Sequence, residues 1–459
     1  MTEPYRPRLH FTPASGWMND PNGLIRIDDL WHLFFQHDPD STKHGPMHWG
    51  HAVSRDLTTW EERPVALRPD RLGTCFSGCA IRNPQGKVTL FYTAHSVTAD
   101  GRDHQVQCAA HADAALERFV PHKANPILGN PGYEVFRDPK VFWHAPTERW
   151  VMMLTEGTKI GFYSSTDLET WTHRTSFGED QGHCRDCIWE CPDLLELPDG
   201  AGGSKWVLIV SVSDGGPGSG SGTQYFIGAF DGHRFFNDNP PETVLWLDNG
   251  RDFYAPQSFF DPDAAAPLAI AWASNWAYAR QTPTEAFRGA MSLPRQLGLL
   301  RTEADWRLAQ SVPAETIAAF DASRDRNTFR LGFNQSFRQQ SDISIALFGE
   351  KEPHFRISWS GERQLTLSTR RAGFDGLPDF AHAYAVDFPW EPNRPLAVEL
   401  FVDRGLVELF CAEGTISLTN LFFPENPAGP LSIEHRGWSA DEATRPQPHM
   451  TQMGGQKNG

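Results

Sequence analysis

Three short stretches of the chain each combine an acidic residue with a proline and an aromatic residue. They are Trp17-Met18-Asn19-Asp20-Pro21-Asn22-Gly23, Phe136-Arg137-Asp138-Pro139-Lys140 and Trp189-Glu190-Cys191-Pro192-Asp193. Glycoside hydrolysis needs two carboxyl groups that flank the scissile bond. One attacks the anomeric carbon or activates water, and the other protonates the leaving oxygen. If these acids meet in one pocket, the sequence predicts cleavage of a glycosidic bond.

Asp20 and Glu190 are acids of the types that these two roles need. The short side chain of Asp20, next to Asn19, can be held rigidly, which suits a nucleophile that stays ionised. Glu190 reaches further, and an apolar wall from Trp189 would raise its pKa so that it can donate a proton. Trp189 equally fits ordinary core packing.

Asp138 follows Arg137, so we expect the carboxylate to stay ionised beside the guanidinium. An ionised carboxylate that does not attack can hydrogen-bond the sugar hydroxyls and strengthen its hold at the transition state. Each stretch also has a simpler interpretation. Asn-Asp-Pro-Asn-Gly is a good turn sequence, and Arg-Asp-Pro fits an ordinary ion pair before a strand.

Hairpin-like segments with turn residues between β-rich runs recur through the first two thirds of the chain. They are Leu24–Gln36, Ala80–Thr93, Val141–Leu154, Leu194–Ser211 and Phe259–Trp272. A second element follows each of the first four, with aspartates that are 57, 54 and 64 residues apart: Asp56, Asp113, Asp167 and Asp231. This period fits a propeller blade of four strands with long loops, so the five units predict a five-bladed β-propeller.

A polar side chain lies two to four residues before each of these hairpins. The five are Asp20, Ser77, Asp138, Glu190 and Gln257. Equivalent positions in successive blades lie around one end of the central axis. The repeat by itself therefore predicts that these five side chains converge.

The hairpin pattern ends near Arg301, where Glu303–Gln310 and Ala314–Phe320 could form short helical turns. From about Asp321 the pattern is again that of strands. Three segments carry it, namely Phe355–Trp359, Gln364–Thr369 and a hairpin at Leu396–Phe410. Alternation with polar turns indicates a β-sandwich.

We therefore expect an all-β chain with a five-bladed propeller followed by a C-terminal β-sandwich. The expected boundaries are a catalytic propeller at 1–305, a linker at 306–322 and the sandwich at 323–459, with a loose tail from about Glu442.

The composition excludes several classes of protein. The formal charge of −16 argues against a nucleic-acid partner, since phosphate binding needs a basic face. We find no apolar run that predicts a membrane span or a secretory signal. The seven cysteines are odd in number and scattered, which is typical of reduced thiols and predicts a cytoplasmic protein. Cys184, Cys187 and Cys191 lack a matched fourth ligand for zinc, so we expect no metal.

At these motifs the sequence resembles the family-32 glycoside hydrolases. These are β-fructofuranosidases that include invertases, exo-inulinases, levanases and sucrose-6-phosphate hydrolases. Trp17–Gly23 resembles the family's nucleophile motif, Arg137-Asp138-Pro139 its stabiliser motif and Glu190-Cys191 its acid/base motif. Further resemblance runs through His48–Ser54, Phe76–Gly78, Tyr254–Phe259, Trp272–Tyr278, Arg288–Arg295 and Val402–Phe410. The family implies the same propeller and sandwich, with Asp20 as nucleophile, Glu190 as acid/base and Asp138 as transition-state stabiliser.

The resemblance also implies retention of configuration through a covalent fructosyl–enzyme intermediate. The carboxyl groups of Asp20 and Glu190 would then lie roughly 5–5.5 Å apart. No metal or organic cofactor is needed for this mechanism. Asn19, Gln36, Ser77 and Arg137 resemble the family's fructose-binding residues, and the remaining candidates for substrate binding are Trp49, Phe76, Gln257, Trp276 and His44. Core packing is the alternative for Trp49 and Trp276. Many members carry a tryptophan roughly where this chain has His44, which leaves the leaving-group preference open.

The leading hypothesis is a retaining β-fructofuranosidase that hydrolyses sucrose. The alternatives are an exo-acting hydrolase of short inulin or levan chains, a fructosyltransferase, and a sucrose-6-phosphate hydrolase, for which Lys43 is a nearby cation. A sugar-binding propeller without catalysis belongs to another class of protein, and Asp20→Asn separates an enzyme from such a binder. The sandwich could cover the propeller's edge or mediate contacts of a homodimer.

Overall fold

The computed structural model describes residues 3–183, 187–262, 264–303, 305–336, 343–348, 353–360, 364–372, 377, 380–391, 394–424 and 432–436. Within these ranges the chain is built mainly of strands, with α1 (Ala314–Ala322) as their one α-helix. The helices of this part of the chain are all too short or too polar to cross a membrane. The tail expected from Glu442 lies outside the described residues.

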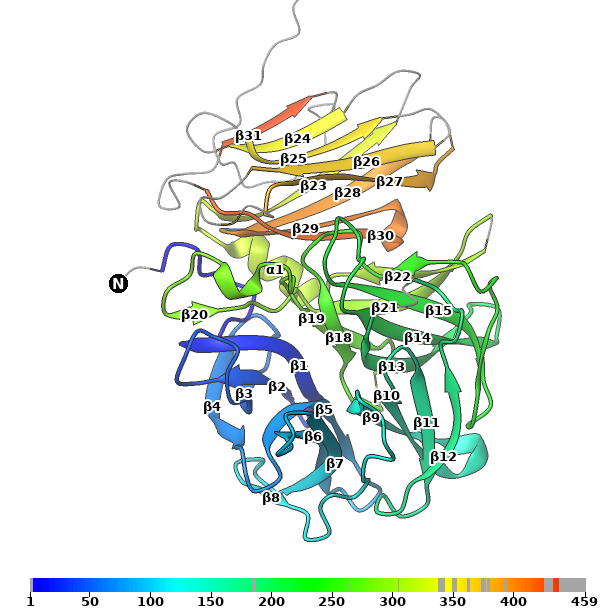
Figure 1. Cartoon of the computed structure of the whole chain (residues 1–459). Helices are drawn as coiled ribbons and strands as arrows, with labels where there is room; N and C mark the ends of the chain where they lie inside the picture. Colours follow the sequence, from blue (N-terminus) through cyan, green and yellow to red (C-terminus); the bar gives the residue numbers. More distant parts are fainter. Residues whose placement is uncertain are drawn as a thin grey trace, which may run out of the picture.

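Five antiparallel sheets make up the first part of the chain (Figure 1). The first holds β1 (Gly16–Ile27), β2 (Leu30–Asp38), β3 (His48–Ser54), β4 (Trp60–Leu67) and the short β20 (Phe287–Arg288). The second holds β5 (Thr74–Arg82), β6 (Val88–Val97), β7 (Asp103–Ala112) and β8 (Phe119–Pro121). The third holds β9 (Arg137–His144), β10 (Arg149–Thr155), β11 (Ile160–Ser165) and β12 (Thr172–Phe177).

The fourth sheet holds β13 (Trp189–Pro198), β14 (Ser204–Val212), β15 (Gly222–Phe230), β16 (Phe235–Asn237) and β17 (Leu245–Trp246). The fifth holds β18 (Tyr254–Ser258), β19 (Leu268–Trp272), β21 (Arg295–Arg301) and β22 (Trp306–Ser311). The innermost strands β1, β5, β9, β13 and β18 each contact the next, and β18 contacts β1. β20 also pairs with β1 in parallel, which ties a late segment to the first sheet. The five sheets therefore form the blades of a closed five-bladed propeller.

The innermost strands begin several residues earlier than the hairpin pattern predicts. Asp20 lies inside β1, while Asp138 and Glu190 are the second residues of β9 and β13. The neighbouring prolines indicated turns. A proline is tolerated in these strands because each is bulged and is paired almost entirely along one edge. The acids are therefore held by strands, and the expectation that they precede the strands was wrong.

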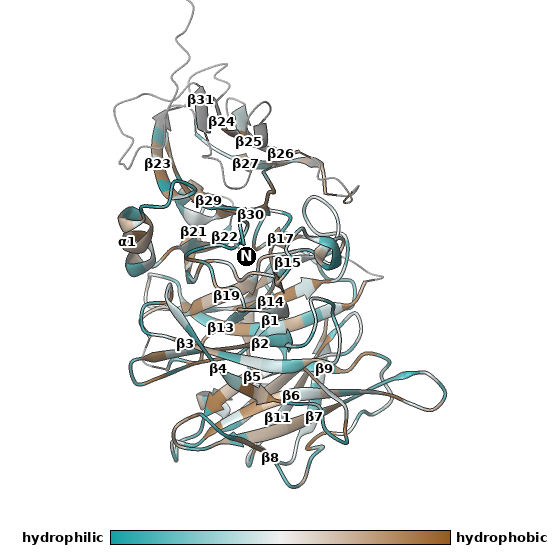
Figure 2. Cartoon of the chain, turned by 90° about the vertical axis from the view of Figure 1, so that its left-hand side faces the viewer, coloured by the Kyte–Doolittle hydropathy of each residue, from teal (hydrophilic) through white to brown (hydrophobic). Residues whose placement is uncertain are grey.

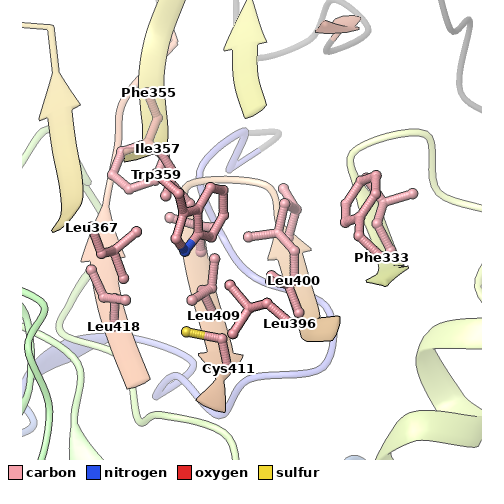
Figure 3. Packing of buried hydrophobic residues seen from close by; sticks show 14 of the residues in the cluster. Phe333, Phe355, Ile357, Trp359, Leu367, Leu396, Leu400, Leu409, Cys411 and Leu418 are labelled. Atoms are coloured by element: carbon pink, nitrogen blue, oxygen red, sulfur yellow. The ribbon is translucent and has the colours of Figure 1, made fainter. Parts of the chain in front are cut away.

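Two further β-sheets pack on each other as the C-terminal β-sandwich, which lies against one side of the propeller (Figure 1, Figure 2). One sheet holds β23 (Thr328–Ser336), β28 (Pro395–Asp403), β29 (Leu406–Cys411) and β30 (Ile416–Leu421). The other holds β24 (Ile343–Phe348), β25 (Pro353–Ser360), β26 (Gln364–Arg371), β27 (His382–Pro389) and β31 (Ser432–Arg436). Between the sheets pack Trp359, Leu367, Leu400 and Leu409, all buried (Figure 3). The hairpin predicted at Leu396–Phe410 is confirmed as β28 and β29.

The segment expected to link the domains differs from the prediction. Trp306–Ser311 is strand β22, which pairs with β21 and completes the fifth blade, so the helical turn expected at Glu303–Gln310 was wrong. Buried Leu308 and Gln310 alternate with more exposed neighbours, which is the period of a strand. The helical turn expected at Ala314–Phe320 is confirmed as α1.

Candidate active site

Side chains from all five innermost strands meet at the end of the ring where these strands begin. Ser77 of β5 donates a hydrogen bond of 2.8 Å from its Oγ to Oδ2 of Asp20 in β1. Cys191 of β13 places its Sγ 3.4 Å from the same Oδ2 and 3.6 Å from Oδ2 of Asp138 in β9. Tyr254 of β18 donates its hydroxyl to Oε2 of Glu190. The structure thus brings the three predicted acids into one cluster.

Bulges at the starts of the innermost strands aim these side chains. The pairing register shifts between Met18 and Pro21, Phe76 and Gly78, Arg137 and Lys140 (opposite Thr155 and Met153 of β10), Glu190 and Asp193, and Tyr254 and Gln257. Three non-glycine residues at these bulges have left-handed backbone angles, with φ of 63°, 49° and 51° at Asp138, Cys191 and Ala255. Neighbours in a regular strand point to opposite faces, whereas a bulge re-aims them. Arg137 and Asp138 can therefore both reach the site.

Asp20 is buried, and its two oxygens have different environments. Oδ2 accepts the Ser77 hydroxyl, while Oδ1 has no hydrogen-bond partner. Burial raises the pKa of Asp20, a hydrogen bond from Asn19 opposes this, and the charge of Glu190 raises it further. An unpartnered oxygen on a buried carboxylate costs free energy, so its retention points to a ligand that uses it.

The pKa of Asp138 is raised. Burial raises it, Arg137 opposes the rise, and the charges of Glu190 and Asp20 add to it, so that the pKa lies at about 7. The backbone N–H of Cys191 donates to its Oδ2 at 3.0 Å. The expectation that Arg137 keeps Asp138 fully ionised was therefore wrong, because Arg137 is itself engaged by another carboxylate.

That other carboxylate is Glu190. Arg137 donates from Nη2 to Oε1 of Glu190 at 2.7 Å and from Nε at 3.2 Å, while Tyr254 holds Oε2. Burial would lower the pKa of Arg137, but the charges of Glu190 and Asp138 outweigh it and raise the pKa. Trp189 packs into the core between the third and fourth blades. Of the two interpretations of Trp189, ordinary core packing is the one that the structure supports.

Sequence reasoning missed the residues that hydrogen-bond the acids or the backbone next to them. Tyr254 was seen only as part of a motif, and Thr93 and Gln105 were not singled out. Thr93 Oγ1 accepts the backbone N–H of Asp138 at 3.0 Å, and Gln105 Oε1 accepts that of Phe136 at 2.8 Å. Both are buried polar residues in β-rich runs, and that was the only signal available.

Several predicted binding residues support the site from within the core. Gln36 Nε2 donates to the carbonyl of Cys75 at 3.0 Å, and Trp49 Nε1 donates to that of Phe76 at 2.9 Å. Both side chains are fully buried, so core packing describes Trp49. They fasten the first blade to the backbone just before Ser77. Asn19 accepts a hydrogen bond of 2.7 Å from Trp17 Nε1, which fixes its amide beside Asp20.

An aromatic wall borders the acids. Trp276 stacks on Trp17 with ring centroids 6.0 Å apart, and His44 meets both rings edge-on at 5.5 and 5.8 Å. Trp276 and Phe76 pack against the same cluster as Cys191 and Tyr254. Burial, followed by the charges of Arg280 and His95, lowers the pKa of His44 to about 4. His44 is therefore a neutral ring at physiological pH, and the structure places it at the site.

Gln257 belongs to a second polar group rather than to the acid cluster. Its amide donates to the carbonyl of Cys191 at 3.1 Å, and its Oε1 accepts from Lys140. Lys140 also pairs with the buried Asp193 at 3.0 Å. These three residues line a cavity of about 200 Å³ that contains none of the catalytic candidates. Tyr254, rather than Gln257, is the member that the fifth blade contributes to the acids.

The described residues contain no group of three histidines, cysteines or acids arranged to hold a metal ion. Five cysteines are free and buried, namely Cys75, Cys79, Cys108, Cys191 and Cys411. Cys187 is disulfide-bonded, so the expectation of reduced thiols throughout was wrong.

Grouped carboxyl groups at the centre of a five-bladed propeller are an arrangement that suits glycoside hydrolysis. Residues 10–311 match the family described as Glycosyl hydrolases family 32 N-terminal domain, and residues 300–445 match Glycosyl hydrolases family 32 C terminal. The chain belongs to glycosyl hydrolase family 32. It is a hydrolase of fructosides, with activity of the β-fructofuranosidase type.

Relatives of known activity span nearly the whole chain. A levanase of Bacillus subtilis is 37% identical over 94% of this chain and 68% of its own length. An extracellular exo-inulinase of Aspergillus niger is 34% identical over 96% of this chain and 93% of its own. The crystal structure of an exo-inulinase from Aspergillus awamori superposes with a TM-score of 0.85 at 30% identity, covering 95% of this chain and 96% of that one.

Proposed function

We propose that this chain removes a terminal β-D-fructofuranosyl unit by double displacement with retention of configuration. In the first step an oxygen of Asp20 attacks the anomeric carbon of fructose. The bond from that carbon to the leaving oxygen breaks as Glu190 gives it a proton. In the second step Glu190 takes a proton from water, whose oxygen attacks the same carbon and releases Asp20. The observation that carries this proposal is the unpartnered, buried Oδ1 of Asp20 within the acid cluster.

Asp138 and Arg137 act as stabilising groups in this scheme. Positive charge develops on the sugar ring at the transition state, and fixed carboxylates favour it. Hydrogen bonds from the sugar hydroxyls to Asp138 would replace the hydrogen bonds to water that the buried carboxylate lacks. Arg137, which contacts Glu190 in the free protein, is placed to exchange that contact for a substrate hydroxyl. The cluster thus changes partners, rather than geometry, when sugar binds.

Sucrose is the leading substrate, with short fructans as the second. The fructan alternative is favoured by the relatives, since a levanase and an exo-inulinase match almost the whole chain. His44 supplies a small neutral ring beside Trp276, and either a glucosyl or a fructosyl leaving group fits such a surface. A phosphorylated leaving group would need a cation, and Arg280, whose guanidinium lies 5.2 Å from the Trp276 ring, is available.

Product analysis tests the proposal. The pure protein is incubated separately with sucrose, an inulin-type trisaccharide, a levan-type trisaccharide and sucrose 6-phosphate, and free glucose and fructose are quantified. Equal glucose and fructose from sucrose are expected. An excess of glucose would mean transfer of fructose to sugar, and fructan cleavage that exceeds sucrose cleavage would assign the alternative.

Asp20→Asn is the matched control, because it keeps the shape of the side chain and removes the nucleophile. We expect hydrolysis to fall by about 10⁴-fold or more while sugar binding persists. Full activity in this variant would exclude Asp20 as the nucleophile. Absence of cleavage of every fructoside by the unaltered protein would exclude the proposal as a whole.

Location and assembly stay predictions. The relative from Aspergillus niger is named as extracellular, whereas the sequence of this chain predicts a cytoplasmic protein. Fractionation of the producing cells decides between the two. Sedimentation of the pure chain tests the homodimer expected through the sandwich.

A further inference from the structure

A short propeller segment, residues 248–252, lies along the edge of sandwich strand β30. The backbone N–H of Asn249 donates to the carbonyl of Ser417 at 2.8 Å, and that of Asp252 donates to the carbonyl of Thr419 at 3.0 Å. In return, the backbone N–H of Thr419 donates to Oδ1 of Asp248 at 2.8 Å. The propeller segment is therefore hydrogen-bonded along the edge of the sandwich sheet.

The same segment leads directly into the active site. Asp252 is followed by Phe253 and then by Tyr254, whose hydroxyl holds Glu190. Phe253 is buried, and its ring lies 4.3 Å from the guanidinium of Arg295. Arg295 in turn pairs with Asp248 at 2.9 Å. The segment before Tyr254 is thus held both by sandwich strand β30 and by Arg295, the first residue of propeller strand β21.

Arg371 of sandwich strand β26 makes a second connection. Its Nη1 donates to Oδ2 of Asp252 at 2.7 Å, and its Nη2 donates to the hydroxyl of Tyr278 at 2.7 Å. The Tyr278 hydroxyl donates in turn to Oδ1 of Asp252. Arg371 and Asp252 are almost completely buried. Tyr278 ends the loop that carries Trp276, so one sandwich residue anchors both the segment before Tyr254 and the aromatic wall.

Asn275 completes this attachment. Its amide donates to the carbonyl of Arg251 at 2.7 Å and to that of Ser221 at 3.2 Å. The loop of Trp276 is therefore tied to segment 248–252 by a side chain next to Trp276 itself. Through that segment it is tied to the sandwich.

We propose that the sandwich domain positions two elements of the active site, the Tyr254 hydroxyl and the Trp276 wall, and that Arg371 and Tyr278 are the positioning residues. This inference rests on the proposed function, because it assigns the aromatic wall to the leaving group. A buried, hydrogen-bonded ion pair between two domains holds its partners in one arrangement relative to each other. Misplacement of a substrate-positioning group by about 1 Å can cost up to 10²-fold in rate.

The test uses Tyr278→Phe, which removes only the hydroxyl, and Arg371→Met, which keeps the length of the side chain. Arg330→Met is the matched control, because Arg330 is also a sandwich arginine, whose carboxylate partners Glu399 and Asp321 lie away from segment 248–252. Each variant is assayed on methyl β-D-fructofuranoside and on an inulin-type trisaccharide. The methyl group is too small to contact the aromatic wall. Comparing the two substrates therefore separates effects on leaving-group binding from effects on the chemical step.

We expect the ratio of kcat/KM for the trisaccharide to kcat/KM for the methyl fructoside to fall about 10-fold in both variants. The ratio should stay at the wild-type value in Arg330→Met. A ratio equal to that of the control in folded Tyr278→Phe would overturn the inference. If Arg371→Met does not fold, Tyr278→Phe carries the test, since it leaves the pair of Arg371 and Asp252 intact.

Amide hydrogen exchange provides a readout that does not depend on activity. Faster exchange is expected in peptides that contain Tyr254–Ser258 and Trp276 in Tyr278→Phe, but not in Arg330→Met. If the unaltered protein cleaves no fructoside, the proposed function fails and this measurement alone decides the inference. Equal exchange in the wild type and Tyr278→Phe would then overturn it.

Discussion

Two buried clusters of charge are both built around three carboxylates. They differ in the direction of the carboxyl pKa shifts and in the hydrogen bonding of the carboxylate oxygens. The active-site cluster has the carboxylates Asp20, Asp138 and Glu190 with one guanidinium, Arg137. The second, which we call the interdomain cluster, joins the propeller to the sandwich. It has three carboxylates and two cations, namely Asp248, Asp403, Glu408, His10 and Arg295.

Burial opposes ionisation in both clusters, but the outcomes are opposite. In the interdomain cluster, hydrogen bonds and charges from His10 and Arg295 outweigh burial and lower the pKa of Asp403 and Glu408. In the active site one guanidinium serves three acids, so the pKa values of Asp20 and Asp138 are raised. The surplus of carboxylates in the active site therefore goes with pKa shifts opposite in direction to those of the interdomain cluster.

Hydrogen bonding shows the same contrast. Both oxygens of Asp403 accept hydrogen bonds, Oδ1 from Thr328 and the backbone of Arg8, and Oδ2 from His10. Oδ1 of Asp20 accepts none. A carboxylate with both oxygens partnered fixes a structure, whereas one with an open acceptor oxygen can accept a hydrogen bond from a ligand. The same substitution should therefore have opposite effects in the two places.

The largest effect on stability is expected from Asp403→Asn. It removes the main partner of buried His10 and several backbone hydrogen bonds, so the free energy of unfolding should fall by about 3–5 kcal/mol. Denaturant unfolding measures this, and the kcat of the molecules that remain folded should change little. An unchanged midpoint would contradict the structural role.

Asp138→Asn should do the reverse. Activity should fall by about 10³-fold, because a carboxylate that stabilises the transition state is lost. The melting temperature should rise, since a carboxylate whose pKa burial raises to about 7 is held at a cost when ionised. Kinetics on sucrose and thermal unfolding at pH 8 test both parts. A lower melting temperature would show that the two clusters do not differ as argued.

The third prediction concerns pH and the interdomain cluster. Asp403 and Glu408 overcome the burial of His10 and raise its pKa to about 9, against an unfolded value near 6.5. The stabilisation is fully present below pH 6.5 and is lost as pH rises through 9, which amounts to about 3 kcal/mol. Unfolding of the wild type and His10→Gln at pH 7 and 10 measures it. Equal losses in the two proteins would contradict the prediction.

The smallest effect is expected from Ser77→Ala. The Ser77 hydroxyl lowers the pKa of Asp20 by a hydrogen bond to Oδ2, so its removal should raise that pKa further. The acid limb of the kcat/KM profile should then move to higher pH, with only a small loss of maximal rate. Thr89→Val, which removes a buried hydroxyl bonded to His111, is the control and should leave the profile unchanged.

The fold and the three acids could be predicted because they follow local patterns. Hairpins with turn residues predicted the blades, and a similar distance of three or four residues before each hairpin predicted that Asp20, Asp138 and Glu190 lie together. The strand starts were missed because proline in a bulged, singly paired strand resembles proline in a turn. The strand at Trp306–Ser311 was missed because its inward residues include the polar Gln310.

Pairings between distant residues could not be predicted. His10 and Asp403 are 393 positions apart in the sequence, and Arg137 and Glu190 come from different blades. Nothing in the local sequence shows that Arg137 pairs more closely with Glu190 than with Asp138, its neighbour in the chain. The pKa of Asp138 was misjudged for this reason. Tyr254 reaches the acids only because the bulge at Ala255 turns the strand.

The most direct test of the account is to trap the covalent intermediate. Glu190→Gln is mixed with a fructoside that has a good leaving group, so that the first step proceeds and the second is slow. After acid quenching and proteolysis, mass spectrometry should find one fructosyl unit on the peptide that contains Asp20. A fructosyl unit on any other residue, or an inverted first product without a trapped intermediate, would contradict the account.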